Sequence, residues 1–187
     1  MLGWLNRRSV VNRKAGELYG GVVTAARNPW FFGPGRVADT PEGRFELVAL
    51  HLFLVAERAK VLPDGEALVQ SLIEAFVTDI DDCMREMGVG DLTVPKRVKR
   101  AAAGFYERSG DYRAALAIAA PEPPQPDPLA AVIARSMLVA PVDERFAQDA
   151  AAYMRASHHS LAATPAADVE AGRFAFAPLP KDKKTPG

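Results

Sequence analysis

The stretch DTPEGRFELVALHLFLVAERAKVLPDG, residues 39–65, decides the fold of this chain. Asp39 or Thr40 can cap a helix whose first turn contains a proline, at a position where the missing N–H group costs nothing. Apolar residues then recur at spacings of three and four, with a second apolar stripe beside the first. Pro63 and Gly65 end the pattern. A helix that is apolar on most sides is expected to be central and buried.

Similar patterns predict helices along the rest of the chain. The next helix is expected at 64–87, with Cys83 in its core stripe and Gly88 as the glycine that ends it. Further helices are expected at 95–108, 112–119, 129–140 and 143–163, with a break at 109–112 and a proline-rich linker at 120–128. The sequence shows no internal repeat and no β-strand pattern, so it predicts an all-α fold with a single compact helical domain.

The chain is expected to have three parts. Residues 1–35 form an N-terminal segment, irregular apart from a short helix at its start, and residues 36–164 form the helical domain. Residues 165–187 form a flexible, disordered tail in which RFAF, at 173–176, is expected to dock. The first ten residues, MLGWLNRRSV, combine apolar residues and a tryptophan with two arginines. That mixture suits contact with a membrane surface, and it also fits a frayed terminus.

Composition limits the classes of function. The chain has 187 residues, 49% of them hydrophobic, and its 23 basic and 23 acidic residues give a net charge of zero. The whole molecule therefore has no strong electrostatic bias toward nucleic acid or membrane. The single cysteine excludes an internal disulfide and suits a reducing compartment. No apolar run reaches the roughly 20 residues of a membrane span, so we expect a cytoplasmic protein.

The stretch DIDDCMREMGVGDLTVPKRVKR, residues 79–100, places an acidic and a basic cluster on either side of a hinge. Residues 64–91 hold eight acids and one base, and residues 94–113 hold six bases and two acids. The two clusters can pair with each other, or they can be two surfaces that bind partners. We expect the partner-binding residues to be Asp79, Asp82, Glu86, Lys96, Lys99 and Arg100, with Gly88 and Gly90 as the hinge.

Neither a metal site nor a cofactor is expected. The DIDD motif at 79–82 lacks the central glycine and terminal glutamate of a calcium loop, and no Glu-x-x-His motif accompanies it. Cys83 is expected to be inert because it falls in a core stripe. The GVG sequence at 88–90 follows a helix, whereas a dinucleotide-binding loop follows a strand.

A catalytic site is weakly supported. His51 shares a helical line with Arg44 and Arg58, and we interpret the three as a polar strip on the central helix. A structural histidine with satisfied hydrogen bonds is the favoured interpretation, because no nucleophile with a matching base is visible nearby. An enzyme with a polar site around His51 remains an alternative, although we expect no enzyme.

Three segments carry a resemblance to a known family. DTPEGRFELVALHLFLV, FVTDIDDCMREMGVGDLTVPKRVKR and FYERSGDYRAAL occur in this order, and over roughly residues 36–160 the chain resembles the ubiquinol–cytochrome c chaperone family. Members of that family are assembly factors for cytochrome b of the respiratory cytochrome bc1 complex. The resemblance implies an all-helical, non-enzymatic chaperone. Mitochondrial relatives act near the ribosomal tunnel exit with a small helical partner.

The resulting functional hypothesis is an assembly chaperone at the cytoplasmic face of the inner membrane. Newly made cytochrome b would be the client, sheltered in a hydrophobic cleft beside the first long helix. The ribosome, a small helical partner and the membrane surface are further expected contacts. The alternative is an RNA- or ribosome-binding module that uses the basic helix at 95–108.

Overall fold

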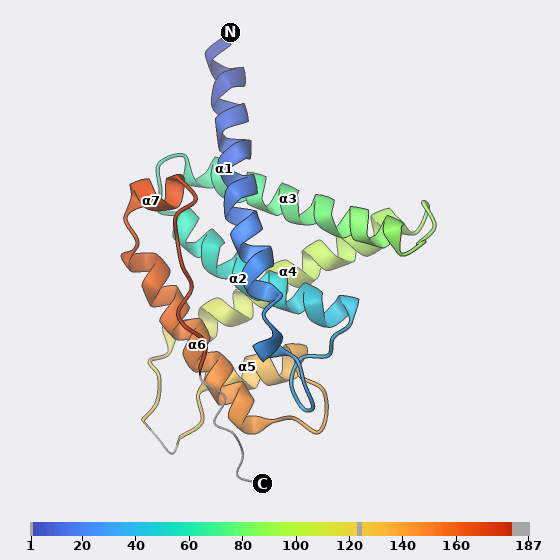
Figure 1. Cartoon of the computed structure of the whole chain (residues 1–187), viewed down its shortest axis with the longest axis vertical. Coiled ribbons are helices and arrows are strands. Elements are labelled where there is room, and N and C mark those ends of the chain that lie inside the picture. The colour runs from blue at the N-terminus through green and yellow to red at the C-terminus, as the bar shows by residue number, and fades with distance from the viewer. Residues whose placement is uncertain (1, 123–124, 181–187) are drawn as a thin grey trace.

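The structure, a computed structural model, describes residues 2–122 and 125–180, with side chains from residue 8 onward (Figure 1). This part of the chain contains seven α-helices, a short 3-10 helix and no strand, which confirms the all-α fold. The α-helices are α1 (Leu2–Ala26), α2 (Pro41–Ala59), α3 (Gly65–Glu86), α4 (Val94–Ala117), α5 (Pro128–Met137), α6 (Glu144–Ala163) and α7 (Ala166–Glu170). The 3-10 helix is η1 (Pro29–Phe31).

Helix α2 is the central element, as residues 39–65 predict. The Thr40 side chain accepts a hydrogen bond from the backbone N–H of Gly43 at 3.2 Å, which confirms the predicted N-cap. Residues 49–56 are all buried. Helices α1, α3, α4, α5 and α6 each pack against α2, so a single core surrounds it.

Helix α1 differs from the irregular segment that the sequence predicts. Residues 2–26 form one helix, which packs along α3 and α2. Its buried residues follow helical spacing: Val11, Ala15, Leu18, Tyr19, Val22 and Ala26. Three glycines at 16, 20 and 21 lower its helix propensity, and burial of the apolar stripe against two other helices offsets that cost. The first turns of α1 project beyond the other helices in Figure 1.

Helix α4 runs unbroken through residues 109–112, so the predicted break there is wrong. Ser109 is buried and donates its hydroxyl hydrogen bond to the carbonyl of Phe105 at 2.8 Å. Tyr112 is fully buried, and its ring lies 5.5 Å from the ring of Phe53 on α2. Packing of these two side chains against the core outweighs the turn signal of a serine next to a glycine.

After α6 the chain turns back across the body. Helix α7 ends at Glu170, and Gly172, two residues further on, has a φ of +72°, which belongs to the left-handed region that favours glycine. Residues 172–180, which we call the strap, then run in extended form along α6 (Figure 1). Phe174 and Phe176 pack against the core, which confirms the docking predicted at 173–176. Of the tail predicted at 165–187, the described residues 165–180 therefore form α7 and the strap. Residues 181–187 lie outside the described residues, as does the centre of the linker at 123–124.

Candidate partner-binding surfaces

Helices α3 and α4 form an antiparallel hairpin whose connected ends project from the body (Figure 1). The tip of the hairpin, residues 87–93, exposes two large apolar side chains. Leu92 is 92% exposed and Met87 is 54% exposed. We call this projecting hairpin the arm. The charged stretch at 79–100 therefore lies at the outer end of the arm.

The turn at the tip is fixed by backbone hydrogen bonds. Gly88 has a φ of +76°, and its N–H group donates to the carbonyl of Arg85 at 2.9 Å. The N–H group of Val89 donates to the carbonyl of Met84 at 3.0 Å. These two bonds form the Schellman motif, which ends a helix with a left-handed glycine. Gly90 has open space around its Cβ position, and its carbonyl accepts from Val94 at the start of α4.

Arg85 joins the two sides of this turn. Its guanidinium donates to Asp81 at 2.5 Å on α3 and to Asp91 at 2.6 Å beyond the glycines. Asp91 is 88% exposed at its side chain, so the contribution of this exposed pair to stability is small. In the sequence, Arg85 is the one base among the eight acids of residues 64–91, and that pattern does not reveal this bridge.

The three predicted acidic residues differ in their surroundings. Asp79 accepts a hydrogen bond from the Tyr19 hydroxyl at 2.8 Å and so connects α3 to α1. Burial, helped by this bond, raises the pKa of Tyr19. Asp82 and Glu86 are exposed. Asp79 thus has a structural role, and Asp82 and Glu86 remain available for contacts with a partner.

Cys83 is exposed, so its predicted place in a core stripe is wrong. The stripe of α3 is buried at Leu68, Leu72 and Phe76, but its continuation passes beyond the body onto the arm. Partial burial, together with neighbouring carboxylates of α3, raises the pKa of the Cys83 thiol. A thiol with a raised pKa is a poor nucleophile at neutral pH.

The predicted basic residues Lys96, Lys99 and Arg100 are all exposed on α4. Their neighbour Arg97 is exposed as well. Within the described residues, no ion pair joins any of the four to an acid of α3. The acidic and basic clusters therefore do not neutralise each other by direct contact, and each is open to solvent on the same arm.

The line of Arg44, His51 and Arg58 on α2 passes through three different environments. Arg44 is exposed and pairs with Asp39 at 2.7 Å. His51 is fully buried. Arg58 donates to the carbonyl of Thr164 at the end of α6 at 2.8 Å. The three side chains thus stabilise different parts of the fold and do not meet in one site.

His51 belongs to a chain of buried hydrogen bonds. Its Nδ1 atom lies 2.8 Å from the Leu47 carbonyl, which only accepts, so Nδ1 carries the proton. Its Nε2 atom, 2.9 Å from the Tyr153 oxygen, then accepts from that hydroxyl. Tyr153 also bonds to Ser157, and Ser157 accepts from the N–H of Ala177 in the strap at 3.0 Å.

Burial lowers the pKa of His51 to about 4, despite the opposing effect of its bond to Leu47. The ring is therefore neutral at physiological pH. A catalytic site around His51 would need an accessible ring, but both ring nitrogens are engaged and the side chain has no exposed surface. The favoured interpretation, a structural histidine with satisfied hydrogen bonds, agrees with this geometry.

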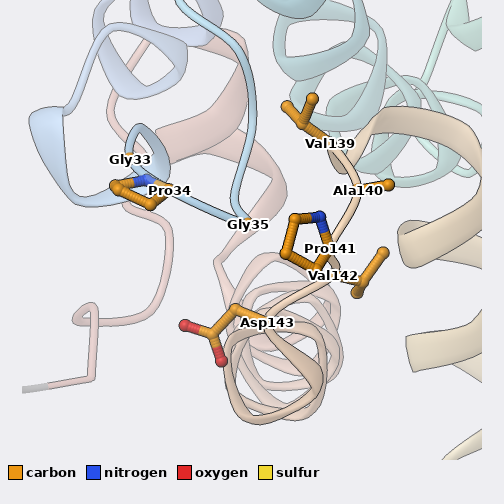
Figure 2. Close-up of a pocket in the computed structure, with 8 residues that line it drawn as sticks. All are labelled: Gly33, Pro34, Gly35, Val139, Ala140, Pro141, Val142 and Asp143. Atoms are coloured by element: carbon orange, nitrogen blue, oxygen red, sulfur yellow. The ribbon is translucent and has the colours of Figure 1, made fainter.

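An open depression of about 600 Å³ lies between two loops (Figure 2). Residues 33–35 line one side and residues 139–143 line the other. Its one carboxylate, Asp143, accepts from the Phe146 N–H at 2.9 Å and so caps α6. The two loops are joined by the bond from the Asp143 N–H to the Gly35 carbonyl at 2.9 Å. The depression therefore lies where these two loops are joined, and it is not the cleft expected beside α2.

Across residues 2–122 and 125–180, no three histidine, cysteine, aspartate or glutamate side chains gather in a way that could hold a metal ion. In the same part of the chain, no helix is both long enough and apolar enough to cross a bilayer.

The fold and its surfaces define a helical protein with a projecting, charged arm and an extended segment docked across its core. The family model described as ubiquinol-cytochrome C chaperone matches residues 35–176, and this chain belongs to that family. It is similar to the crystal structure of the Cbp3 homolog from Brucella abortus, with 32% sequence identity and a TM-score of 0.78. That similarity covers 95% of this chain and 97% of the Brucella chain. A search of curated proteins finds no match.

Proposed function

We propose that this protein is an assembly chaperone of the cytochrome bc1 complex and that its client is newly made cytochrome b. The observation that carries the proposal is the family match over residues 35–176, which spans α2 to α6 and part of the strap. The surfaces described above support a mechanism of binding without covalent chemistry. The exposed tip of the arm offers apolar side chains beside both charges, which suits a client with apolar and charged segments.

The place of action is proposed as the cytoplasmic face of the inner membrane, where cytochrome b is inserted. The projecting first turns of α1 belong to the segment for which the sequence predicts membrane-surface contact. The side chains of residues 1–7 lie outside the described part of the structure, so this contact rests on their sequence alone. A small helical partner protein is part of the same proposal and rests on the family resemblance.

Deletion of the gene tests the proposal. Under conditions that require the bc1 complex, the deletion strain should show less cytochrome b. The measurement is the absorbance difference between the chemically reduced and the oxidised sample, which should be smaller than in wild type. A plasmid copy of the wild-type gene should restore the signal. Affinity purification of the tagged protein from respiring cells should recover cytochrome b. Normal cytochrome b levels in the deletion strain would contradict the chaperone function.

The second candidate function is binding of RNA or of the ribosome through the basic face of α4. It is favoured by the solvent exposure of Lys96, Lys99 and Arg100 without an ion pair to α3. Phosphate contacts of this kind weaken steeply as salt rises. Co-sedimentation with ribosomes at 50 mM and 200 mM salt, about the range in which such contacts weaken, tests this candidate. Equal sedimentation of wild type and a variant with these three charges reversed would exclude it.

A further inference from the structure

The strap is bound as a separate peptide would be bound. It has no helix or strand, and side chains of α6 recognise its backbone. The Ser157 oxygen accepts from the Ala177 N–H at 3.0 Å, and the Ser160 hydroxyl donates to the Ala175 carbonyl at 3.2 Å. Ser157 is fully buried. Ser157 thus accepts a hydrogen bond from the backbone of an extended segment at a position away from water. Such a bond fixes the segment in place and does not depend on its side chains.

The strap side chains alternate between the core and solvent. Phe174 and Phe176 pack inward, whereas Arg173 and Ala175 are exposed. This is the period of two expected for an extended chain. The Phe176 ring lies 4.8 Å from the His51 ring at an interplanar angle of 87°, and the Phe174 ring lies 5.5 Å from that of Phe176.

Helix α1 forms the other side of the groove. A Cβ atom at Gly21 would lie 2.6 Å from the tip of the Phe174 ring, so glycine leaves the space that this ring occupies. The adjacent Gly20 has nothing within 4 Å of its Cβ position. The groove is thus bounded by α1 and α6 and has His51 of α2 at its floor.

We infer that this groove is a binding site for extended client segments with aromatic residues two positions apart, and that the strap occupies it until a client displaces it. The inference rests on the proposed chaperone function, which supplies an apolar client. It adds to that function the location at which the client binds and the sequence pattern that this location selects. The sequence pattern does not reveal Ser157 and Ser160, because their partners lie 20 and 15 residues further along the chain.

The first experiment measures how the strap is held. In the full-length protein, Gly21→Ala should displace Phe174 and raise amide hydrogen exchange over residues 172–180 at least tenfold. The matched control, Gly20→Ala, lies one residue away in open space and should leave that exchange unchanged. Equal exchange in the two variants would show that the Phe174 contact does not hold the strap and would overturn the inference.

The second experiment measures exchange of the occupant. The probe is a fluorescent peptide with the sequence of residues 171–180, AGRFAFAPLP, measured by anisotropy. In wild type the attached strap competes at an effective concentration on the order of millimolar, so binding should be weak. In the double variant Phe174→Ala/Phe176→Ala the strap is weakened and the groove is intact, so the peptide should bind at least tenfold more tightly. Binding no tighter than in wild type would overturn the inference.

A folding control accompanies the double variant, because Phe176 covers His51. If its circular dichroism melt shows that it is unfolded, Ala177→Pro replaces it, since this change removes the N–H group that bonds to Ser157 and keeps both phenylalanines. The same tighter binding is then required. Adding Ser157→Ala to the variant used should weaken peptide binding at least fivefold, and unchanged binding would place the peptide outside the groove.

The client is tested separately with overlapping ten-residue peptides of cytochrome b from the same organism. Peptides with two aromatic residues at positions i and i+2 should bind the double variant, and the unlabelled strap peptide should displace them. Binding that the strap peptide does not displace, or no binding at all, would overturn the client assignment. Loss of cytochrome b in the deletion strain does not depend on the strap, so failure of the groove and failure of the chaperone function are distinguishable.

Discussion

At the scale of single residues, His51 makes stability depend on pH. Its pKa is lowered to about 4 by burial, whereas an unfolded histidine titrates near 6.5. The folded protein therefore holds the neutral ring, and this contribution to stability is complete above pH 6.5 and is lost as pH falls toward 4. Between pH 7 and pH 5 we expect a loss of about 2 kcal/mol from this group.

The measurement is urea unfolding of wild type and His51→Gln at both pH values. Other titrating groups are common to both proteins, so the difference in their pH dependence isolates His51. The variant should lose about 2 kcal/mol less than wild type between pH 7 and pH 5. Equal pH dependence would mean that His51 titrates at an ordinary pKa in the folded protein.

Gly88 has a backbone conformation that other residues adopt only with strain. Its φ of +76° is unfavourable for a β-branched residue, so Gly88→Val should cost about 1–3 kcal/mol in free energy of unfolding. Gly90→Ala is the matched control, because its Cβ would lie in open space and it has no positive φ. Thermal melting compares the two. An unchanged melting temperature in Gly88→Val would exclude the left-handed conformation.

At the scale of elements, local signals predicted α2 and the end of α3 well. The Thr40 cap and the Gly88 turn are each determined by residues within one helical turn, so sequence alone contains the necessary information. Helix α1 was not predicted at its full length, because its glycines weaken the local signal and packing on α3 supplies the compensation. The misplaced break in α4 has the same cause, since burial of Tyr112 is a tertiary effect.

The basic face of α4 is expected to act in binding and to contribute little to folding. Reversal of Lys96, Lys99 and Arg100 to glutamate should change the free energy of unfolding by less than about 1 kcal/mol, because exposed charges contribute little. Binding to ribosomes, to anionic vesicles or to the client should fall. Thermal melting and co-sedimentation with each binding partner measure the two effects.

The control for this reversal has the same change in net charge at other places. Arg13, Arg135 and Arg145 are each at least 60% exposed at their side chains and lie on α1, α5 and α6. Reversing these three should leave binding unchanged if the face of α4 is the contact surface. Unfolding of the α4 variant would instead indicate an internal clamp, and equal loss of binding in both variants would indicate a general charge effect.

At the scale of the whole molecule, α1 is expected to fold in one unit with the other helices. Leu18 has no exposed surface and belongs to the common core, so Leu18→Ala should cost about 2–5 kcal/mol. Thr24→Ala on the exposed side of the same helix should change stability by less than about 0.5 kcal/mol. Unfolding followed by circular dichroism should show one transition in both. A separate early transition in Leu18→Ala would indicate that α1 unfolds independently.

The candidate sites were only partly predictable, for a reason that applies to the whole fold. Sequence spacing correctly placed acidic and basic residues on two neighbouring helices. It does not reveal where a helix leaves the body, so Cys83 was assigned to the core although it lies on the arm. It also does not reveal which distant segment covers a buried histidine. The strap over His51 therefore emerged only from the structure.

The bond between Tyr19 and Asp79 makes the projecting hairpin a lever. From Asp79, where the Tyr19 hydroxyl of α1 is bonded, the axis of α3 extends about 12 Å to Met87, at 1.5 Å per residue. A force that a partner applies at Leu92 acts on this bond with the mechanical advantage of that length. Pulling on the tip would therefore strain the contact between α1 and α3 before it strained the core around α2.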